Sequence, residues 1–263
     1  MKMSESVTLD HEDRAEIYDY VEQHGTVPKT EVITGTLDQR RALTHHVAIL
    51  KRDGYLEETD DGELRISLET GEEESFSTDE DVEFTIRPAR QDDLAGIVGA
   101  IRQVTEGMTY VVAESVADEL DHENVLLRHN ELESRMFFVA TVEDSEAGGD
   151  SESSSGVGPR DEVVGWAHLH APELEKLSHT AELTVGVLDG YRSRGIGSHL
   201  LERALEWADE NGYEKLYQSV PSSNEQAIEF FEDRGWKVEA VRENHYKLGE
   251  EYIDEVMMGL VLS

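Results

Sequence analysis

The segment AELTVGVLDGYRSRGIGSHLLERALEWADENG, Ala181 to Gly212, decides the fold of most of this chain. Alternating apolar residues predict a half-buried strand: Leu183, Val185 and Val187. Apolar residues at helical spacing then predict an amphipathic helix: Leu200, Leu201, Leu205 and Ala208. Between strand and helix lies the turn RxxGxG, Arg192 to Gly197. The segment is therefore a strand, a glycine turn and a helix.

The glycine turn predicts a pyrophosphate site. Glycines let the backbone approach a ligand closely, and the amides that open a helix bind an anion without a charged side chain. A dinucleotide fold also uses such a turn, but Leu200 stands where its third glycine would be. Gly186, inside the strand, predicts a bulge or a close backbone approach, which would leave amides free for an extended ligand.

With a second motif, NEQAIEFFEDRGW from Asn224 to Trp236, the chain resembles the GNAT superfamily of acetyl-CoA-dependent N-acyltransferases over residues 82–263. The resemblance implies that the strand binds the pantetheine arm, that the turn binds the pyrophosphate and that Asn224 reaches the arm. The cofactor-binding residues implied are Val185, Val187, Arg192, Ser193, Arg194, Gly195, Ile196, Gly197, Ser198, Asn224 and Phe231.

The chain departs from the family at Phe231, where many relatives have a Tyr that protonates the leaving thiolate. A phenyl ring cannot do so. Either Tyr217 or Tyr246 replaces it, or water does, or the domain binds the cofactor without turnover. Our prediction for the catalytic pair is Glu182 and Tyr246.

Glu182 is the candidate general base because it starts the central strand and because some relatives carry a catalytic Glu at this place. A base matters most for a lysine. Deprotonating a lysine amine at pH 7 costs about 4.6 kcal/mol, whereas an α-amine near pKa 7.7 costs only about 1 kcal/mol. The alternative is an exposed carboxylate at a strand end, one of 59 acidic residues.

Composition excludes several classes. With no Cys there is no disulfide, thiolate metal site or cysteine nucleophile. No apolar run is long enough for a membrane span and the start lacks a signal peptide, so we expect a cytoplasmic protein. The net charge of −36 suggests a halophilic archaeon, because molar salt shortens the Debye length to about 3 Å and screens the repulsion between carboxylates.

The order of predicted elements gives two domains. Residues 1–70 form the first, 71–82 an acidic linker, and 83–263 the GNAT-like domain with a mobile acidic loop at 143–162. In the second domain we predict strands at Phe84–Arg87, Met136–Val142 and Val163–Leu169, and helices at Asp92–Gln103 and Val116–Asn130. The fold class is α+β: a mixed, mostly antiparallel sheet flanked by helices.

The first domain is similar to a winged helix-turn-helix of archaeal regulators. Three helices, the third capped by Asp38, precede a hairpin of Tyr55–Glu58 and Leu64–Leu68. Polar residues on the third helix could face DNA: Arg40, Arg41, Thr44 and His45. Residues 1–70 carry 8 cations and 16 carboxylates, so DNA binding and protein docking both stay open.

The function expected is N-acetyl transfer from acetyl-CoA to an amine of a protein N-terminus, a lysine or a small molecule. The alternative is a transcriptional regulator whose GNAT-like domain senses acetyl-CoA. A homodimer is conceivable. His168 and His170 point to one face of a strand and could line the acceptor cleft, but a third metal ligand is not evident, so no metal is expected.

Overall fold

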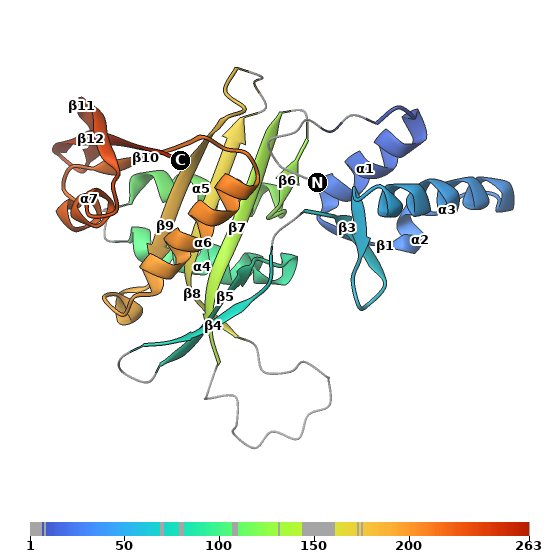
Figure 1. The fold of residues 1–263 in the computed structure, drawn as a ribbon, viewed down its shortest axis with the longest axis horizontal. Helices are drawn as coiled ribbons and strands as arrows, with labels where there is room; N and C mark the ends of the chain where they lie inside the picture. The colour runs from blue at the N-terminus through green and yellow to red at the C-terminus, as the bar shows by residue number, and fades with distance from the viewer. Residues whose placement is uncertain are drawn as a thin grey trace.

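A computed structural model describes residues 7, 9–68, 71–78, 82–106, 110–130, 132–143, 161–172, 174 and 176–262. Two units lie side by side in Figure 1: a small N-terminal unit in blue and a larger α+β unit. Among the residues described, no helix is long and apolar enough to cross a membrane.

A nine-stranded sheet forms the larger unit. In the described chain its order is β11-β12-β10-β9-β8-β7-β5-β4, and β6 pairs with β7. The strands are β4 (Glu74–Ser77), β5 (Glu83–Pro88), β6 (Arg128–His129), β7 (Glu133–Val142), β8 (Glu162–Pro172), β9 (Thr180–Val187), β10 (Lys215–Pro221), β11 (Lys237–Leu248) and β12 (Glu251–Val261). The neighbouring strands are antiparallel except β9 and β10, which are parallel. The mixed α+β class is as predicted.

Helices cover both faces of this sheet (Figure 1). They are α4 (Leu94–Thr105), α5 (Val111–Glu123), α6 (Ile196–Glu210) and α7 (Glu225–Glu232), with short 3-10 turns at Gln91–Asp93 and Asp189–Tyr191. Trp166 and Trp207 are fully buried between sheet and helices. Burying such large apolar side chains is the main favourable contribution to folding.

The strands β9 and β10 separate along their length. Their parallel register covers only Thr180–Glu182 against Lys215–Tyr217. Beyond Glu182, β9 pairs only with β8 among the residues described, while β10 pairs with β12. One backbone edge of Leu183–Val187 therefore faces a gap in the sheet.

Gly186 has a different role from the one predicted. The register between β8 and β9 is unbroken, so β9 carries no bulge at Gly186; a register shift lies instead between β7 and β8, at Ala140 and Thr141. A Cβ at residue 186 would lie 2.1 Å from the ring of Trp166. The close approach expected of this glycine is made by a core side chain.

Three local predictions differ from the structure. Part of the acidic segment is the strand β4, which pairs with β5 at the sheet edge. The helix predicted at Val116–Asn130 is α5, which starts five residues earlier and ends at Glu123 because Asn124 is left-handed. Asp38 does not cap its helix; Thr36 does, in a capping box with Gln39. The predicted loop lies mostly outside the described residues.

The N-terminal unit has its own core. Its elements are α1 (Glu12–His24), β1 (Thr26–Pro28), α2 (Lys29–Val32), α3 (Leu37–Arg52), β2 (Leu56–Glu58) and β3 (Glu63–Ile66), with the sheet order β1-β3-β2. Tyr18 and Val21 from α1, Leu50 from α3 and Leu64 from β3 are buried together. The helices and hairpin have the predicted order, and the winged-helix resemblance stays a prediction.

Candidate functional site

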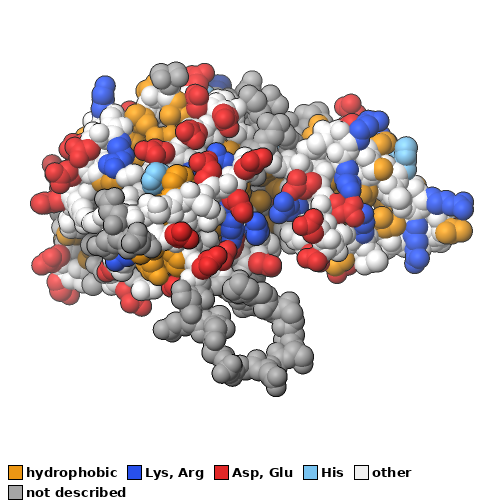
Figure 2. Space-filling model, turned by 60° about the horizontal axis from the view of Figure 1, so that its bottom comes forward, with side chains coloured by type: hydrophobic (Ala, Val, Ile, Leu, Met, Phe, Trp, Pro, Cys, Tyr) orange, Lys and Arg blue, Asp and Glu red, His pale blue; other side chains and the backbone are white. Residues whose placement is uncertain are grey.

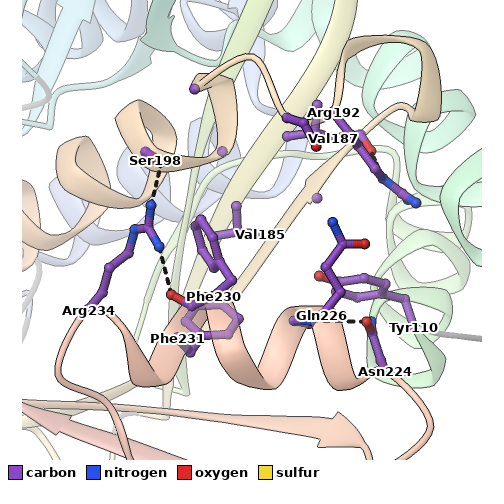
Figure 3. A pocket seen from close by; sticks show the side chains of 15 residues that line it. Tyr110, Val185, Val187, Arg192, Ser198, Asn224, Gln226, Phe230, Phe231 and Arg234 are labelled. Atoms are coloured by element: carbon purple, nitrogen blue, oxygen red, sulfur yellow. Dashed lines mark hydrogen bonds between the residues drawn. The ribbon is translucent and has the colours of Figure 1, made fainter.

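A cavity of about 470 Å³ opens where β9 leaves β10. Figure 3 shows its side chains coming from the end of β9, the start of α6 and the length of α7. The lining residues are Tyr110, Val185, Gly186, Val187, Arg192, Ser193, Gly195, Gly197, Ser198, Asn224, Gln226, Ala227, Phe230, Phe231 and Arg234.

The glycine turn lies at one wall of this cavity. Gly195 is the N-cap of α6 with φ +87°, a left-handed conformation that favours glycine, and Ser193 is also left-handed at φ +60°. The amides of Ile196 and Gly197, in the first turn of α6, have no partner within the helix. An anion bound here would meet backbone donors at the positive end of the helix dipole.

Two arginines hold the walls of the cavity in place. Arg192 donates from Nε to the carbonyl of Val187 at 2.9 Å and pairs with Asp189 at 2.6 Å. Arg234 donates to Oγ of Ser198 at 2.7 Å and lies over the ring of Phe230 at 3.9 Å (Figure 3). Arg234 therefore connects α7 to the start of α6.

The α7 side of the cavity combines polar and aromatic groups. Oδ1 of Asn224 accepts from the amide of Ala227 at 3.1 Å and caps α7. The hydroxyl of Tyr110 is hydrogen-bonded to the Asn224 side chain, and burial raises the pKa of Tyr110. Phe231 is 1% exposed and packs edge-on against Trp236, so it is both a core residue and part of the cavity wall.

Most of the residues predicted to bind a cofactor line this cavity. The exceptions are Ile196, which is buried beneath the turn, and Arg194, whose guanidinium lies 5.9 Å from the ring of Tyr191. Sequence reasoning missed Tyr110, Gln226, Phe230 and Arg234. Arg234 stands beside the motif glycine Gly235, a signal that could have been used, whereas Tyr110 belongs to a distant segment without a recognisable pattern.

A row of ionisable residues crosses the sheet at the other end of β9. The strand registers place Arg135 opposite His170, His170 opposite Glu182, and Glu182 opposite Tyr217. Residues opposite one another project to the same face of a sheet. Glu182 therefore lies between an imidazole and a phenol, three residues or about 10 Å along β9 from Val185.

The environment of Glu182 suits a proton acceptor. Burial raises the pKa of Glu182 above its ordinary value; His170 opposes this and Glu255 adds to it. The hydrogen bond that Nε2 of His170 donates to the carboxylate of Glu133, at 3.4 Å, raises the pKa of His170. Burial also raises the pKa of Tyr217, and the charge of Glu182 adds to the effect, so this phenol holds its proton.

Tyr246 lies on β11 and is part of a second cluster. Its hydroxyl donates to Oε1 of Glu255 at 2.9 Å, and Arg242 pairs with the same carboxylate at 2.7 Å. Burial, followed by this hydrogen bond, raises the pKa of Tyr246 well above its usual range. The charge of Glu182 contributes to that shift, so the Tyr246 cluster and the row act on one another.

The two histidines of β8 stack on one another, with ring centroids 6.3 Å apart, but differ in their burial and in their partners. His168 is buried, stacks on Phe137 at 4.4 Å, and its Nδ1 lies 3.3 Å from Oγ1 of Thr184. Burial lowers its pKa well below the ordinary value, so it is neutral at pH 7. His170 is the member of the pair that belongs to the row.

The fold and this site define a class of protein. A glycine turn that can bind a pyrophosphate, an open strand edge beside it and a half-buried carboxylate on the same strand are the parts of an acyl-CoA-dependent acyltransferase. Residues 106–236 match the family model described as "Acetyltransferase (GNAT) family".

Curated relatives agree with this class. The N-alpha-acetyltransferase of Saccharolobus solfataricus is 28% identical over 64% of this chain and 89% of that protein. N-alpha-acetyltransferase 50 of Danio rerio is 35% identical over 25% of this chain and 39% of that protein. The chain spans between 39% and 59% of the length of the first three curated relatives.

Solved structures share the fold. The GCN5-related N-acetyltransferase from Kribbella flavida superposes with a TM-score of 0.53 and 20% identity, over 68% of this chain and 98% of that chain. Residues 106–236, just under half of the chain, therefore match the GNAT family of acetyltransferases, whose members use acetyl-CoA as cosubstrate.

Proposed function

We propose that this protein transfers the acetyl group of acetyl-CoA to the α-amine of a protein N-terminus. The observation that carries the proposal is the position of Glu182, between His170 and Tyr217 and on the strand that lines the cavity. The names of the relatives, N-alpha-acetyltransferases among them, support an α-amine as the acceptor.

The residues around the gap have distinct roles in this proposal. Acetyl-CoA supplies the acetyl group as a thioester, with its phosphates at the Gly195 turn and its arm along Val185–Val187. Glu182 takes a proton from the incoming ammonium, which for an α-amine costs only about 1 kcal/mol at pH 7. A backbone amide on the open edge of β9 donates to the developing oxyanion.

Two phenols are candidates for the group that protonates the leaving thiolate. Tyr217 lies beside Glu182 in the row and Tyr246 donates to Glu255. Both have raised pKa values and hold their protons at neutral pH. Since Tyr246 already donates its proton to a carboxylate, we favour Tyr217 over the Tyr246 predicted from sequence.

The test is thiol release from acetyl-CoA in 2 M KCl, with three acceptors: a peptide with a free α-amine, the same peptide blocked at its N-terminus but carrying lysine, and spermidine. We expect release and a mass gain of one acetyl group with the first acceptor only. Acetylation of lysine alone would contradict the α-amine proposal. Binding of acetyl-CoA without release in any arm would favour the sensor alternative.

We further propose that the protein works in molar salt. Figure 2 shows Asp and Glu side chains spread over the face drawn, and the chain carries 59 of them against 23 Lys and Arg. Repulsion among so many carboxylates strains the fold in dilute buffer, whereas molar salt screens it. Circular dichroism should show cooperative unfolding at a temperature that rises between 0.1 and 3 M KCl; a constant midpoint would contradict this.

The N-terminal unit keeps its two possible roles, docking to protein or to DNA. The predicted DNA-facing residues Arg40, Arg41, Thr44 and His45 are all exposed on α3. A gel shift with random duplex at several salt concentrations separates the two roles, because binding through phosphates weakens steeply with salt.

A further inference from the structure

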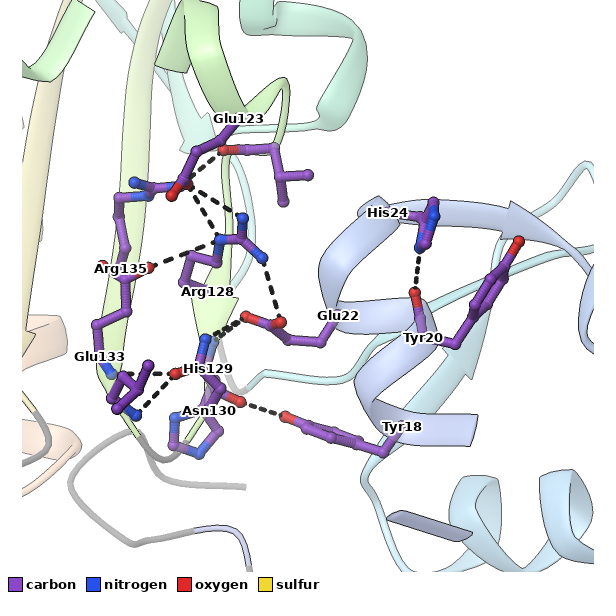
Figure 4. A network of polar contacts seen from close by, with 12 residues as sticks. Tyr18, Tyr20, Glu22, His24, Glu123, Arg128, His129, Asn130, Glu133 and Arg135 are labelled. Carbon is purple, nitrogen blue, oxygen red and sulfur yellow. Dashed lines mark hydrogen bonds and ion pairs between the residues drawn. The ribbon is translucent and has the colours of Figure 1, made fainter. Parts of the chain in front are cut away.

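A buried carboxylate joins the N-terminal unit to the larger unit. Glu22 of α1 is only 2% exposed. It accepts hydrogen bonds from Nδ2 of Asn130 at 2.8 Å and from the amide of His129 at 3.3 Å, and it pairs with Nη1 of Arg128 at 3.2 Å (Figure 4). A buried charge is costly unless it is paired in this way, so Glu22 fixes its partners strongly.

A tyrosine completes the joint. The hydroxyl of Tyr18, one helical turn before Glu22, donates to the carbonyl of His129 at 2.9 Å. Both backbone groups of His129 are thus bound by α1. The N-terminal unit therefore holds the segment Arg128–Asn130, which includes β6 and directly precedes β7.

Charged contacts connect this joint to His170 and Glu182, which we call the acceptor side of the site because Glu182 is the proposed base for the incoming amine. Nε of Arg128 lies 3.6 Å from Oε1 of Glu133, and the other oxygen of Glu133 lies 3.4 Å from Nε2 of His170. His170 is opposite Glu182 across β8 and β9. One carboxylate, Glu133, is thus shared between an arginine held by Glu22 and the imidazole beside Glu182.

We propose that Glu22 is a positioning residue for the acceptor side: it balances the charge of Arg128, so that Glu133 stays available to hold His170 beside Glu182. The proposal rests on the proposed function for its catalytic meaning. Glu22 lies outside the segment that matches the family model, which begins at residue 106, so this coupling is a feature of the N-terminal unit of this chain.

The direction of the effect follows from the charges. Without Glu22, Arg128 is balanced by Glu123 and Glu133 alone, Glu133 moves toward it, and His170 loses the partner that raises its pKa. The pKa of His170 should then fall. The charged and titratable groups around His170 are Glu133 and Arg135 on β7, Glu119 on α5, Glu182 on β9 and His168 on its own strand.

The test is an NMR titration of the His170 imidazole, identified by its loss in His170→Gln. In 2 M KCl we expect Glu22→Gln to lower the pKa of His170 by about 0.3 to 1 unit, a shift that an imidazole titration resolves. Salt screens exposed charges strongly but buried charges much less, so the salt concentration alone does not separate a direct Coulomb effect from a shift that travels through the contacts; the double-mutant cycle with Glu133 does. The matched control is Glu58→Gln, which removes another paired carboxylate of the N-terminal unit.

A double-mutant cycle between Glu22 and Glu133 tests whether the effect of Glu22 on His170 passes through Glu133. Glu133→Gln should lower the pKa of His170 at least as much, and Glu22→Gln should add nothing in that background. Glu22→Asp keeps the charge but shortens the side chain, and gives a smaller shift in the same direction should the Gln variant fail to fold. An unchanged pKa of His170 in folded variants, or additive shifts, would overturn the proposal.

Steady-state kinetics then measure the effect of Glu22 on catalysis. In Glu22→Gln we expect kcat for the peptide to fall about 3- to 10-fold while the KM for acetyl-CoA stays constant. The acid limb of the pH profile should move to higher pH, because a less charged His170 no longer lowers the pKa of Glu182. Because the NMR titration needs no turnover, a wild-type protein without acetyltransferase activity would refute the proposed function and leave the coupling testable.

Discussion

The two ends of β9 present different kinds of groups to the ligands that we propose for them. The Val185–Val187 end offers backbone groups, the glycine turn and a helix N-terminus, none of which depends on protonation. The Glu182 end offers a row of side chains whose charges depend on one another. Changes at the first end should therefore affect cofactor binding at every pH, and changes at the second should affect the rate and its pH dependence.

The largest effect is expected from Gly195→Glu. A non-glycine residue at φ +87° costs about 1 to 2 kcal/mol, and its carboxylate would face the phosphates. Calorimetry in 2 M KCl should show at least a 100-fold loss of affinity for coenzyme A. Gly190→Glu is the matched control, because nothing lies within 4 Å of the Cβ position there and the residue is not in the cavity wall. Equal loss in both variants would mean that charge alone is responsible.

At the other end of β9, Glu182→Gln should lower kcat about 100- to 1000-fold without changing the affinity for coenzyme A. The acid limb of the wild-type pH profile should report a pKa above the ordinary Glu value and should disappear in the variant, because rate is gained as the carboxylate deprotonates. Steady-state kinetics from pH 5 to 9 checks this. Unchanged kcat would remove Glu182 from the mechanism and break the comparison between the two ends.

A smaller effect separates the two phenols. Tyr217→Phe should lower kcat about 10-fold and flatten the alkaline limb, whereas Tyr246→Phe should change kcat less than 3-fold. The reason is that the Tyr246 proton is engaged by Glu255. Both variants keep their rings, so thermal unfolding serves as a check on packing. The reverse ranking would return the acid role to Tyr246, as predicted from sequence.

The smallest effect is expected from Phe231→Tyr, which adds the hydroxyl that the family resemblance implies at this position. If Tyr217 already protonates the thiolate, the rate should change less than 2-fold. A gain of 10-fold or more would show that the acid is missing from the natural chain and that the cavity end of β9 is incomplete. Thiol release measured alongside wild type decides between these outcomes.

The sequence predicted the residues at the Val185–Val187 end of β9, which line the cavity, better than the residues that surround Glu182 at the other end. The reason is physical. The glycine turn and the motif Asn224–Trp236, which contains α7, are each continuous in sequence, and the properties inferred for them lie in the backbone that those residues dictate. The row from Arg135 to Tyr217 is assembled from four strands, so it exists only once the registers are known. The position of Glu182 on its strand was enough to predict it as the base, but the sequence did not predict that His170 and Tyr217 lie on either side of it.

The same reasoning explains what was missed or misjudged. Tyr110 reaches the cavity from a segment more than 70 residues before the motif. Gly186 was expected to mark a bulge or a close backbone approach that serves a ligand, but the packing of the sheet places the ring of Trp166 against it instead. Glu22 occupies a core-facing position four residues after Tyr18, which in a chain with 59 acidic residues is the one sequence signal of a buried charge.

The partial pairing of β9 and β10 has a consequence for inhibitor design. Since the open strand edge and Glu182 belong to one continuous strand, a single molecule can occupy the cavity and the space beside Glu182 at the same time. A conjugate that ties a peptide's first nitrogen to the sulfur of coenzyme A through a two-carbon bridge should gain from effective concentration what neither half has alone. Lengthening or shortening that bridge would measure the distance between the two halves in solution.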